Sequence, residues 1–479
     1  MKRSMLFFVL SFCVIFGIQG DGSPEKELSR LDRTLLWAVK NNHLWIAKVM
    51  IKAGANTNTL DEYSLKTTLM DAAYNGNVEV VKLLLEANNV SVDRKNRDGY
   101  TALMFAVMQG HIEVMKLLFE YGAEINVRNI HDNTALMVAA RYGVDIEVME
   151  LLLARGAIIN DRNKFGYTPL MLAAQQRGSI EVMSWFLENK ATVNDQAEDG
   201  NTALTLATSL AAEQGIIGAV EFLLKNGAEV NVCNKKGETS LMVAAQYGDA
   251  TGVMELLLEN GADVDAQNED GNTALILATQ LAAMRISSAD TVKLLLKNRA
   301  DVNVHDKDGN SPLIWAAFYA HLDVMRLLFE NEADANAENA KGDSVLIEAV
   351  KKGNIRVAEL LLDNGADVLF QDKDGYTAVD HAKIYQECKP TGKYKVKNSK
   401  HLITLLRLHE ERQANKVKEG LKGQKKKDIL EPEETNTGIN DGVLNGAGAV
   451  GAESGPLGAK VLLGGGGSSH GSLVLDGVN

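Results

Sequence analysis

An internal repeat constrains this chain more than any other feature of its sequence. A Thr/Ser-x-Leu motif recurs, and its apolar anchor returns at intervals of 34, 34, 33, 34, 34, 37, 34, 38, 33 and 33 residues. A constant period of this length is the signature of stacked repeat architectures. The sequence therefore predicts ten to eleven units, caps included. The anchors, which number the units below, are Leu35, Leu69, Leu103, Leu136, Leu170, Leu204, Leu241, Leu275, Leu313, Leu346 and Val379.

Each unit is expected to form two short helices and a hairpin, as the third unit illustrates. Thr101 can cap a first helix predicted over 102–109. A second helix, predicted over 112–121, carries its leucines at helical spacing and ends at Gly122. The next segment alternates apolar residues and leads to Asp-Gly, which is a hairpin signal.

Neither helix is long enough to be stable alone in water, so each must bury its leucines against neighbouring units. Paired alanines such as Ala139–Ala140 and Ala173–Ala174 let adjacent helices approach closely. The predicted fold class is all-α with short β-hairpins, a solenoid of stacked helix-turn-helix units over residues 28–412.

At this level of detail the unit resembles the ankyrin repeat, whose signature pairs T-P-L-H-x-A-A with G-A-D-V-N. The chain has TPLMLAA at Thr168, NGAEVN at Asn226 and NGADVD at Asn260. It departs from the signature where histidine follows the leucine, because methionine or isoleucine stands there instead. We expect this change to remove a local hydrogen bond, to add apolar stacking, and to leave the fold class unchanged.

Units 6 and 8 depart from the regular length. Their extra residues, in SLAAEQGIIG and QLAAMRISSAD, fall between the two helices of the unit. Extended helices or a looser turn is the favoured interpretation, and a shared protrusion is the alternative. Trp315 occupies the same slot as Phe105 and Val138 and is expected in the core.

Residues 1–20 are predicted to be a secretory signal peptide. Lys2 and Arg3 precede an apolar run, and Gly20 offers a small residue for cleavage. The run is short for a membrane span. Cleavage would make the protein periplasmic or secreted. The alternative is an uncleaved, membrane-anchored segment, since Ile-Gln-Gly is only a fair cleavage site.

The C-terminal region changes in composition. Residues 389–427 hold thirteen Lys or Arg against three acids, which favours a solvated cap over a phosphate- or membrane-binding site. A last helix is predicted over 401–413, where four leucines would close the stack. Residues 414–479, Lys-rich and then Gly-rich, are predicted to be a disordered tail.

No motif indicates catalysis, a cofactor or a metal site. His111 and His321 begin second helices and are expected to be structural caps. The sequence has neither a phosphate-binding loop nor a nucleophile elbow. Cys233 and Cys388 lie four repeats apart and are expected to be unpaired. With a net charge of −13, nucleic acid is not an expected partner.

The family resemblance implies that hairpin tips and first-helix ends line a concave binding face. Aromatic and arginine side chains, the residues that most often anchor interfaces, recur at these positions. Tyr74, Tyr142, Tyr247 and Tyr319 are expected roughly in line. The predicted protein-binding residues are Arg97, Tyr100, Arg141, Tyr142, Phe165, Tyr167, Tyr247, Phe318, Tyr319 and Tyr376.

The sequence thus favours a non-enzymatic, exported, monomeric scaffold that binds another protein on its concave face. A membrane-anchored adaptor is one alternative. Another, suggested only by the habits of the family, is a host-directed effector of an intracellular bacterium. Replacing Tyr142, Tyr167 and Tyr319 with alanine is expected to weaken partner binding by more than ~2 kcal/mol.

Overall fold

A computed structural model describes residues 30–61, 65–87, 90–176, 180–247, 250–283, 289–387 and 399–428. The chain divides into two units, Met1–Lys416 and Val417–Asn479, and the solenoid lies in the first. The predicted signal or anchor at residues 1–20 and most of the predicted tail lie outside the described residues. In the described part of the chain, no helix is both long enough and apolar enough to cross a membrane.

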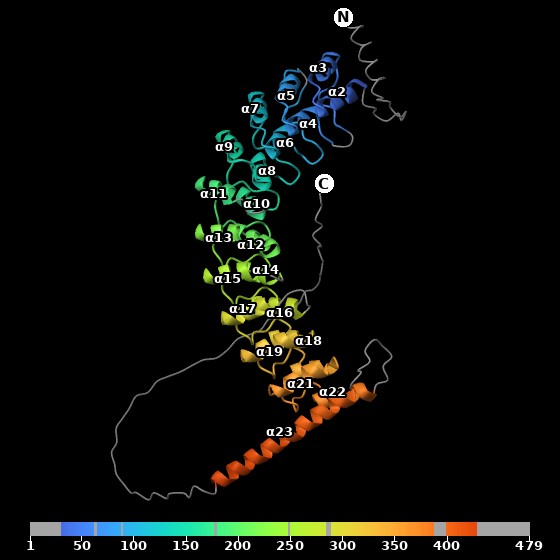
Figure 1. Cartoon of the computed structure of the whole chain (residues 1–479), viewed down its shortest axis with the longest axis vertical. Helices are drawn as coiled ribbons and strands as arrows, with labels where there is room; N and C mark the ends of the chain where they lie inside the picture. The colour runs from blue at the N-terminus through green and yellow to red at the C-terminus, as the bar shows by residue number, and fades with distance from the viewer. Residues whose placement is uncertain are drawn as a thin grey trace, which may run out of the picture. The chain divides into compact units, whose positions relative to one another are not determined.

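The described helices alternate between a first and a second helix in each unit (Figure 1). The first helices are α2 (Arg30–Lys40), α4 (Thr68–Tyr74), α6 (Ala102–Met108), α8 (Ala135–Tyr142), α10 (Pro169–Gln175), α12 (Ala203–Gln214), α14 (Ser240–Ala245), α16 (Ala274–Ala283), α18 (Pro312–Phe318), α20 (Val345–Lys351) and α22 (Ala378–Glu387). The second helices are α3 (Leu44–Lys52), α5 (Val78–Leu85), α7 (Ile112–Glu120), α9 (Ile146–Ala154), α11 (Ile180–Glu188), α13 (Gly218–Lys225), α15 (Thr251–Glu259), α17 (Asp290–Lys297), α19 (Leu322–Glu330) and α21 (Ile355–Asp363), and α23 (Ser399–Asp428) closes the series. The predicted all-α solenoid is confirmed.

Hydroxyl side chains begin the first helices, as predicted. Thr101 Oγ1 accepts the backbone N–H of Met104 at 3.3 Å, and the same cap recurs in the other units. In unit 5 the backbone N–H of Thr168 also donates to Met171 Sδ at 3.5 Å. The expected loss of a hydrogen bond at the methionine position is therefore only partial, because the thioether is a weak acceptor.

The two histidine caps have different outcomes. His321 Nδ1 accepts the N–H of Val324, so its capping role is confirmed. The prediction for His111 is confirmed in part: it is the N-cap residue of α7, but its side chain makes no cap bond, and its Nε2 instead lies 3.0 Å from the carbonyl oxygen of Tyr74. That contact joins the second helix of unit 3 to the first helix of unit 2.

The core runs through the stack of units. Every anchor is buried, from Leu35 at 0% exposed to Val379 at 4%. The paired alanines are buried as well, and each first helix packs on the first helix of the next unit. The repetition therefore supplies a continuous core to helices that lack one of their own.

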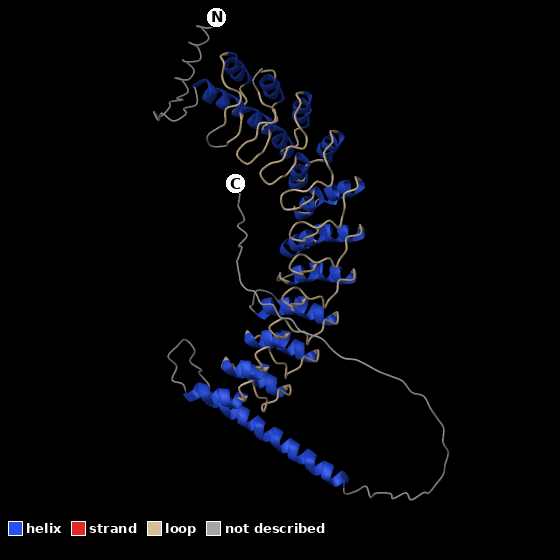
Figure 2. Cartoon of the chain, turned by 180° about the vertical axis from the view of Figure 1, so that it is seen from behind, coloured by secondary structure: helices blue, strands red, loops and turns tan. Residues whose placement is uncertain are grey.

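The loops between units are turns, and the predicted short β-hairpins are only partly formed. No strand occurs among the described residues, and Figure 2 shows loops without strands between the helices; three isolated bridges remain, such as Gln371 with Thr377. The reason is visible in unit 4, where Asn129 Oδ1 accepts the N–H groups of His131 and Asn133. A side chain thus takes the donors that a hairpin ladder would use.

The loop tips bond to one another along the stack. The N–H of Ile130 donates to the carbonyl of Asp98, and equivalent bonds continue unit by unit to Ala340. Gly99, with φ of +80°, sits so close to the next loop that a Cβ would lie 2.7 Å from Asn129 Cα. These bonds hold the tips in a fixed row, and we call the tips together with the adjoining first-helix ends the loop-tip face.

The longer units and the C-terminal end agree with expectation in part. Units 6 and 8 extend their first helices, with α12 reaching Gln214 and α16 reaching Ala283. The helix predicted over 401–413 is longer in the structure, where α23 spans Ser399–Asp428. Leu402 and Leu406 are buried as expected, whereas Leu408 is 49% exposed.

Candidate protein-binding face

The loop-tip face gathers the predicted binding residues into separate groups rather than one continuous strip. In units 3 and 4, Tyr100 lies half-buried against Phe105, with ring centroids 5.7 Å apart. Burial raises the pKa of Tyr100, and Tyr142 and Arg141 are near enough to act on it electrostatically. Tyr142 is 52% exposed. The structure thus brings Tyr100, Arg141 and Tyr142 together, and Arg97 is exposed at the tip of the same unit as Tyr100.

A second group lies on units 4 and 5. Phe165 is 48% exposed at the loop tip and lies 5.9 Å from the His131 ring and 6.5 Å from the Tyr167 ring. Tyr167 is half-buried, and its hydroxyl donates to Asp199 Oδ2 at 3.1 Å. Burial and the Asp199 carboxylate raise the pKa of Tyr167 to about 12. Tyr167 therefore joins two units, whereas Phe165 is open to solvent.

Tyr247 stands apart from both groups. It follows the short helix α14 and is half-buried, and its hydroxyl lies 2.9 Å from Ser209 Oγ on α12. The predicted alignment of tyrosines at equivalent helix ends is still recognisable, because Tyr74 and Tyr142 end α4 and α8 and Tyr319 is the C-cap residue of α18. Tyr247 contributes to packing between units.

A third aromatic group lies on unit 9. Phe318 is 43% exposed, Tyr319 stacks on Trp315, and Lys352 Nζ lies 3.8 Å from the Phe318 ring centroid. The prediction that Trp315 belongs to the core is wrong. Its indole is only half-buried, and Nε1 donates to Asp306 Oδ2 at 2.9 Å, which ties the ring to the loop.

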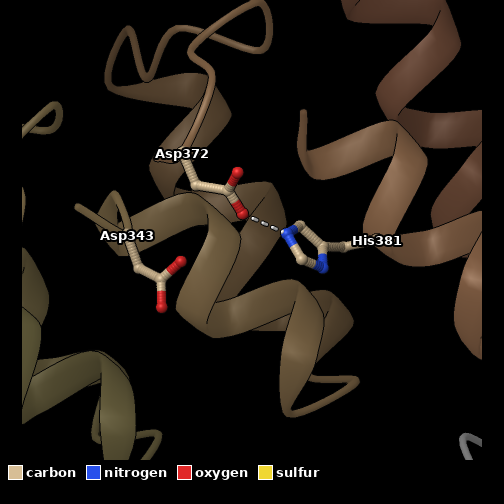
Figure 3. A group of neighbouring side chains, drawn as sticks. All are labelled: Asp343, Asp372 and His381. Atoms are coloured by element: carbon tan, nitrogen blue, oxygen red, sulfur yellow. Dashed lines mark hydrogen bonds and ion pairs between the residues drawn. The ribbon is translucent and has the colours of Figure 1, made fainter. Parts of the chain in front are cut away.

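The last predicted residue, Tyr376, is 45% exposed and packs edge-on against His381. His381 Nε2 lies 2.6 Å from Asp372 Oδ2, and Asp343 lies beside this pair (Figure 3). Among the described residues, these three can each offer one ligand atom to a metal ion, all within 4.8 Å of one another. This group was not predicted from the sequence.

The two carboxylates of this group already accept hydrogen bonds from other residues of the chain. Asp372 Oδ1 accepts the N–H groups of Asp374 and Tyr376, and Asp343 Oδ1 accepts a bond from Lys351 Nζ at 2.6 Å. Burial opposes ionisation of Asp372, but the bonds from His381 and the backbone outweigh it, and the pKa of Asp372 is lowered.

The Asp372–His381 contact also repeats a structural device. His381 follows Asp372 by the same nine residues that separate Trp315 from Asp306 and Glu348 from Asn339, and both of those pairs are hydrogen-bonded. We therefore interpret the group as loop-to-helix bracing. The nine-residue spacing was the signal in the sequence that could have revealed it.

The cysteine prediction is confirmed for Cys233, which is free and exposed. Cys388 lies outside the described residues.

Comparison with known proteins agrees with the repeat geometry. The family described as ankyrin repeats (3 copies) matches residues 35–129, 136–210, 208–283 and 279–372, and the family described as ankyrin repeats (many copies) matches residues 107–153. No curated protein matches the chain. The family matches cover well over half of the chain, in register with its stacked units, and the chain belongs to the ankyrin repeat family.

Proposed function

We propose that this chain is a monomeric, non-enzymatic scaffold that recognises a partner protein on its loop-tip face. Ankyrin repeat proteins are generally non-enzymatic, and their repeats indicate protein interaction. The observation that carries the finer proposal is the exposure of Phe165 on a loop tip that is bonded to the next unit, and of Tyr142 and Phe318 at the ends of first helices. Rigid exposed aromatic side chains lose little entropy on binding and commonly anchor interfaces.

A pull-down with the full-length chain as bait tests this proposal. The variant combines Tyr142→Ala, Phe165→Ala and Phe318→Ala, which removes rings that are 52%, 48% and 43% exposed. Tyr167 is left intact, because its bond to Asp199 gives it a role between units. A protein retained by the original chain and lost by the variant supports the proposal.

A matched control variant tests whether the effect is specific to the loop-tip face or follows the removal of any exposed apolar side chains. Val78, Tyr121 and Ile180 are 39%, 40% and 46% exposed and lie on the second helices α5, α7 and α11 or at their ends. Replacing these three with alanine should leave partner capture unchanged. The proposal would be contradicted if both variants lost partner capture equally. It would also be contradicted if the loop-tip variant kept its helicity and still captured the partner.

We also propose that the chain is exported by a cleaved N-terminal signal, on the strength of its charged start and apolar run. Fractionation of cells expressing the full-length chain, with sequencing of the mature N-terminus, tests this. A mature protein that begins near residue 21 in the exported fraction is expected. An intact N-terminus in the membrane fraction would favour the anchored alternative.

A further inference from the structure

We infer that units 3–5 of the loop-tip face bind an acidic peptide segment that also carries apolar or aromatic side chains. This inference rests on the proposed function and names the chemistry of the partner. It comes from the distribution of charge along the face, which differs sharply between neighbouring sets of units.

The charge contrast is found in the loops. Loops 90–100, 123–133 and 157–167, in units 3–5, hold six Lys or Arg against five Asp or Glu. Loops 191–201, 228–238 and 262–272, in units 6–8, hold two against nine. First-helix residues increase the difference, since α8 adds Arg141 and α12 adds Glu213. In a chain of net charge −13, the loops and first-helix ends of units 3–5 thus carry a small positive excess, although the second helices of these units are acidic.

Five of these seven cations are of two kinds; of the other two, Lys95 donates to the carbonyl of Arg128 and Arg94 is exposed. Arg128 pairs with Asp161 at 2.7 Å, and Arg162 pairs with Asp195 at 3.0 Å, so these guanidinium groups link consecutive units. Within the part of the chain that the structure describes, no ion pair engages Arg97, Arg141 or Lys164, and all three are exposed. Their charges remain available to carboxylates of a partner, which are the groups that arginine binds best.

Apolar contact surface lies beside these free cations. Tyr142 and Phe165 are exposed, and Ile130, at 52% exposed, lies one residue before His131, whose ring is next to that of Phe165. Loops 191–201, 228–238 and 262–272 contain no aromatic residue at all. A segment that combines acidic and apolar residues would satisfy both features of units 3–5, whereas a purely charged segment would leave the rings uncovered.

The acidic loops of units 6–8 argue against a long polyanion such as nucleic acid. Packed helices lie about 8–10 Å apart, so three units span on the order of 25 Å. An extended peptide covers about 3.3 Å per residue, and roughly eight to ten residues would fill units 3–5 without reaching unit 6. A nucleic acid strand extending onto Glu198 and Asp199 would meet repulsion from its phosphates.

Selection from a display library of random twelve-residue peptides tests the inference. The full-length chain is the bait, and the readout is the net charge and apolar content of the enriched sequences. One variant reverses the free cations with Arg97→Glu, Arg141→Glu and Lys164→Glu. The matched control reverses Lys235 and Lys236 to glutamate, since these exposed tip residues lie on units 6–8. Circular dichroism verifies that both variants keep the helicity of the original chain.

We expect the enriched peptides to be acidic and to carry aromatic or aliphatic residues. The affinity of such a peptide, measured by fluorescence anisotropy, should fall at least tenfold in the variant of units 3–5 and change less than twofold in the control. Added salt should weaken binding. Neutral or basic enriched peptides, equal effects in both variants, or no enrichment would overturn the inference. Tighter binding of single-stranded RNA, or a dimer that dissociates in the triple variant, would also overturn it.

These outcomes are separable from failure of the proposed function. Basic or neutral peptides whose binding still depends on Tyr142 and Phe165 would reject the acidic partner and leave the loop-tip face as the binding site. If no loop-tip substitution changed peptide binding, both the acidic partner and the loop-tip binding face would be rejected.

Discussion

Units 3–5 and units 6–8 have the same scaffold and different surfaces. Both sets bury their anchor leucines, cap their first helices with threonine and bond their tips in one row. They differ at exposed tip positions, where Arg97 and Phe165 in one set correspond to the acids Glu198 and Asp199 in the other. The comparison shows that, in this fold, the residues that determine geometry and the residues that set the charge and aromatic content of the tips occupy different positions.

The largest expected effect tests the shared core. Leu136 and Leu241 are 0% and 1% exposed in units 4 and 7. Because both replacements leave a cavity of similar size, Leu136→Ala and Leu241→Ala should each lower the free energy of unfolding by about 3 kcal/mol. Urea unfolding followed by circular dichroism measures this. A difference of more than about 2 kcal/mol between the two variants would show that the cores are not equivalent.

The second prediction tests the difference in surface. Combining Tyr142→Ala with Phe165→Ala removes exposed rings, and we expect it to weaken partner binding by about 2 kcal/mol, which is roughly 30-fold. Tyr247→Ala should change the affinity less than twofold, because that hydroxyl is bonded to Ser209. Titration calorimetry with the captured partner measures both. If Tyr247→Ala lowered the affinity more than the double variant did, the proposed roles of the two regions would be reversed.

The third prediction concerns the side chains that link consecutive loops. Arg128 donates to both carboxylate oxygens of Asp161 and to the carbonyl of Arg162, whereas Gln196 bridges only to the carbonyls of Gly200 and Cys233. Hydrogen bonds between charged groups are stronger than those between neutral groups. Because these side chains are partly exposed, solvent reduces the contribution of the bonds to stability. Arg128→Ala should therefore cost about 1–2 kcal/mol of unfolding free energy, against roughly 0.5–1 kcal/mol for Gln196→Ala.

Thermal unfolding of these two variants gives the comparison. A loss from Gln196→Ala that equals or exceeds the loss from Arg128→Ala would show that the ion pair adds nothing to the carbonyl bonds.

The smallest expected effect lies where the two regions meet, at the Tyr167–Asp199 hydrogen bond. The pKa of Tyr167 is raised to about 12 in the folded chain, above the unfolded value of about 10. Between these values the folded state holds the proton that the unfolded state has lost, so stability should fall as pH rises through this window.

Absorbance titration of Tyr167 tests this prediction, with Tyr167→Phe used to identify its signal. The variant Asp199→Asn should lower the pKa of Tyr167, because it removes a negative charge beside the hydroxyl. An unchanged pKa in that variant would mean that burial alone is responsible.

Much of the fold could be predicted from the sequence, because the period of the repeat reports directly on which residues are buried. The anchors and caps could be located to within a residue, as Thr101 and Leu103 illustrate. The hairpins were less predictable, since Asn129 satisfies the loop donors with its side chain and the tips pair between units instead.

The candidate binding face was harder to predict than the fold. Sequence position indicated which residues lie near the tips, but it could not show that Tyr167 and Tyr247 are engaged with neighbouring units while Phe165 is open. Nor could it show that the indole of Trp315 is bonded to Asp306 in the loop. Such contacts depend on side-chain rotamers, which a repeat alignment does not contain.

The most direct test of the central claim is site-specific photo-crosslinking to the captured partner. A photoreactive side chain would be placed at Phe165 in one variant and at Lys235, an exposed tip residue of unit 7, in another. If the partner lies on the loop-tip face of units 3–5, it should crosslink through position 165 and not through position 235. Efficient crosslinking from position 235 alone would contradict that claim.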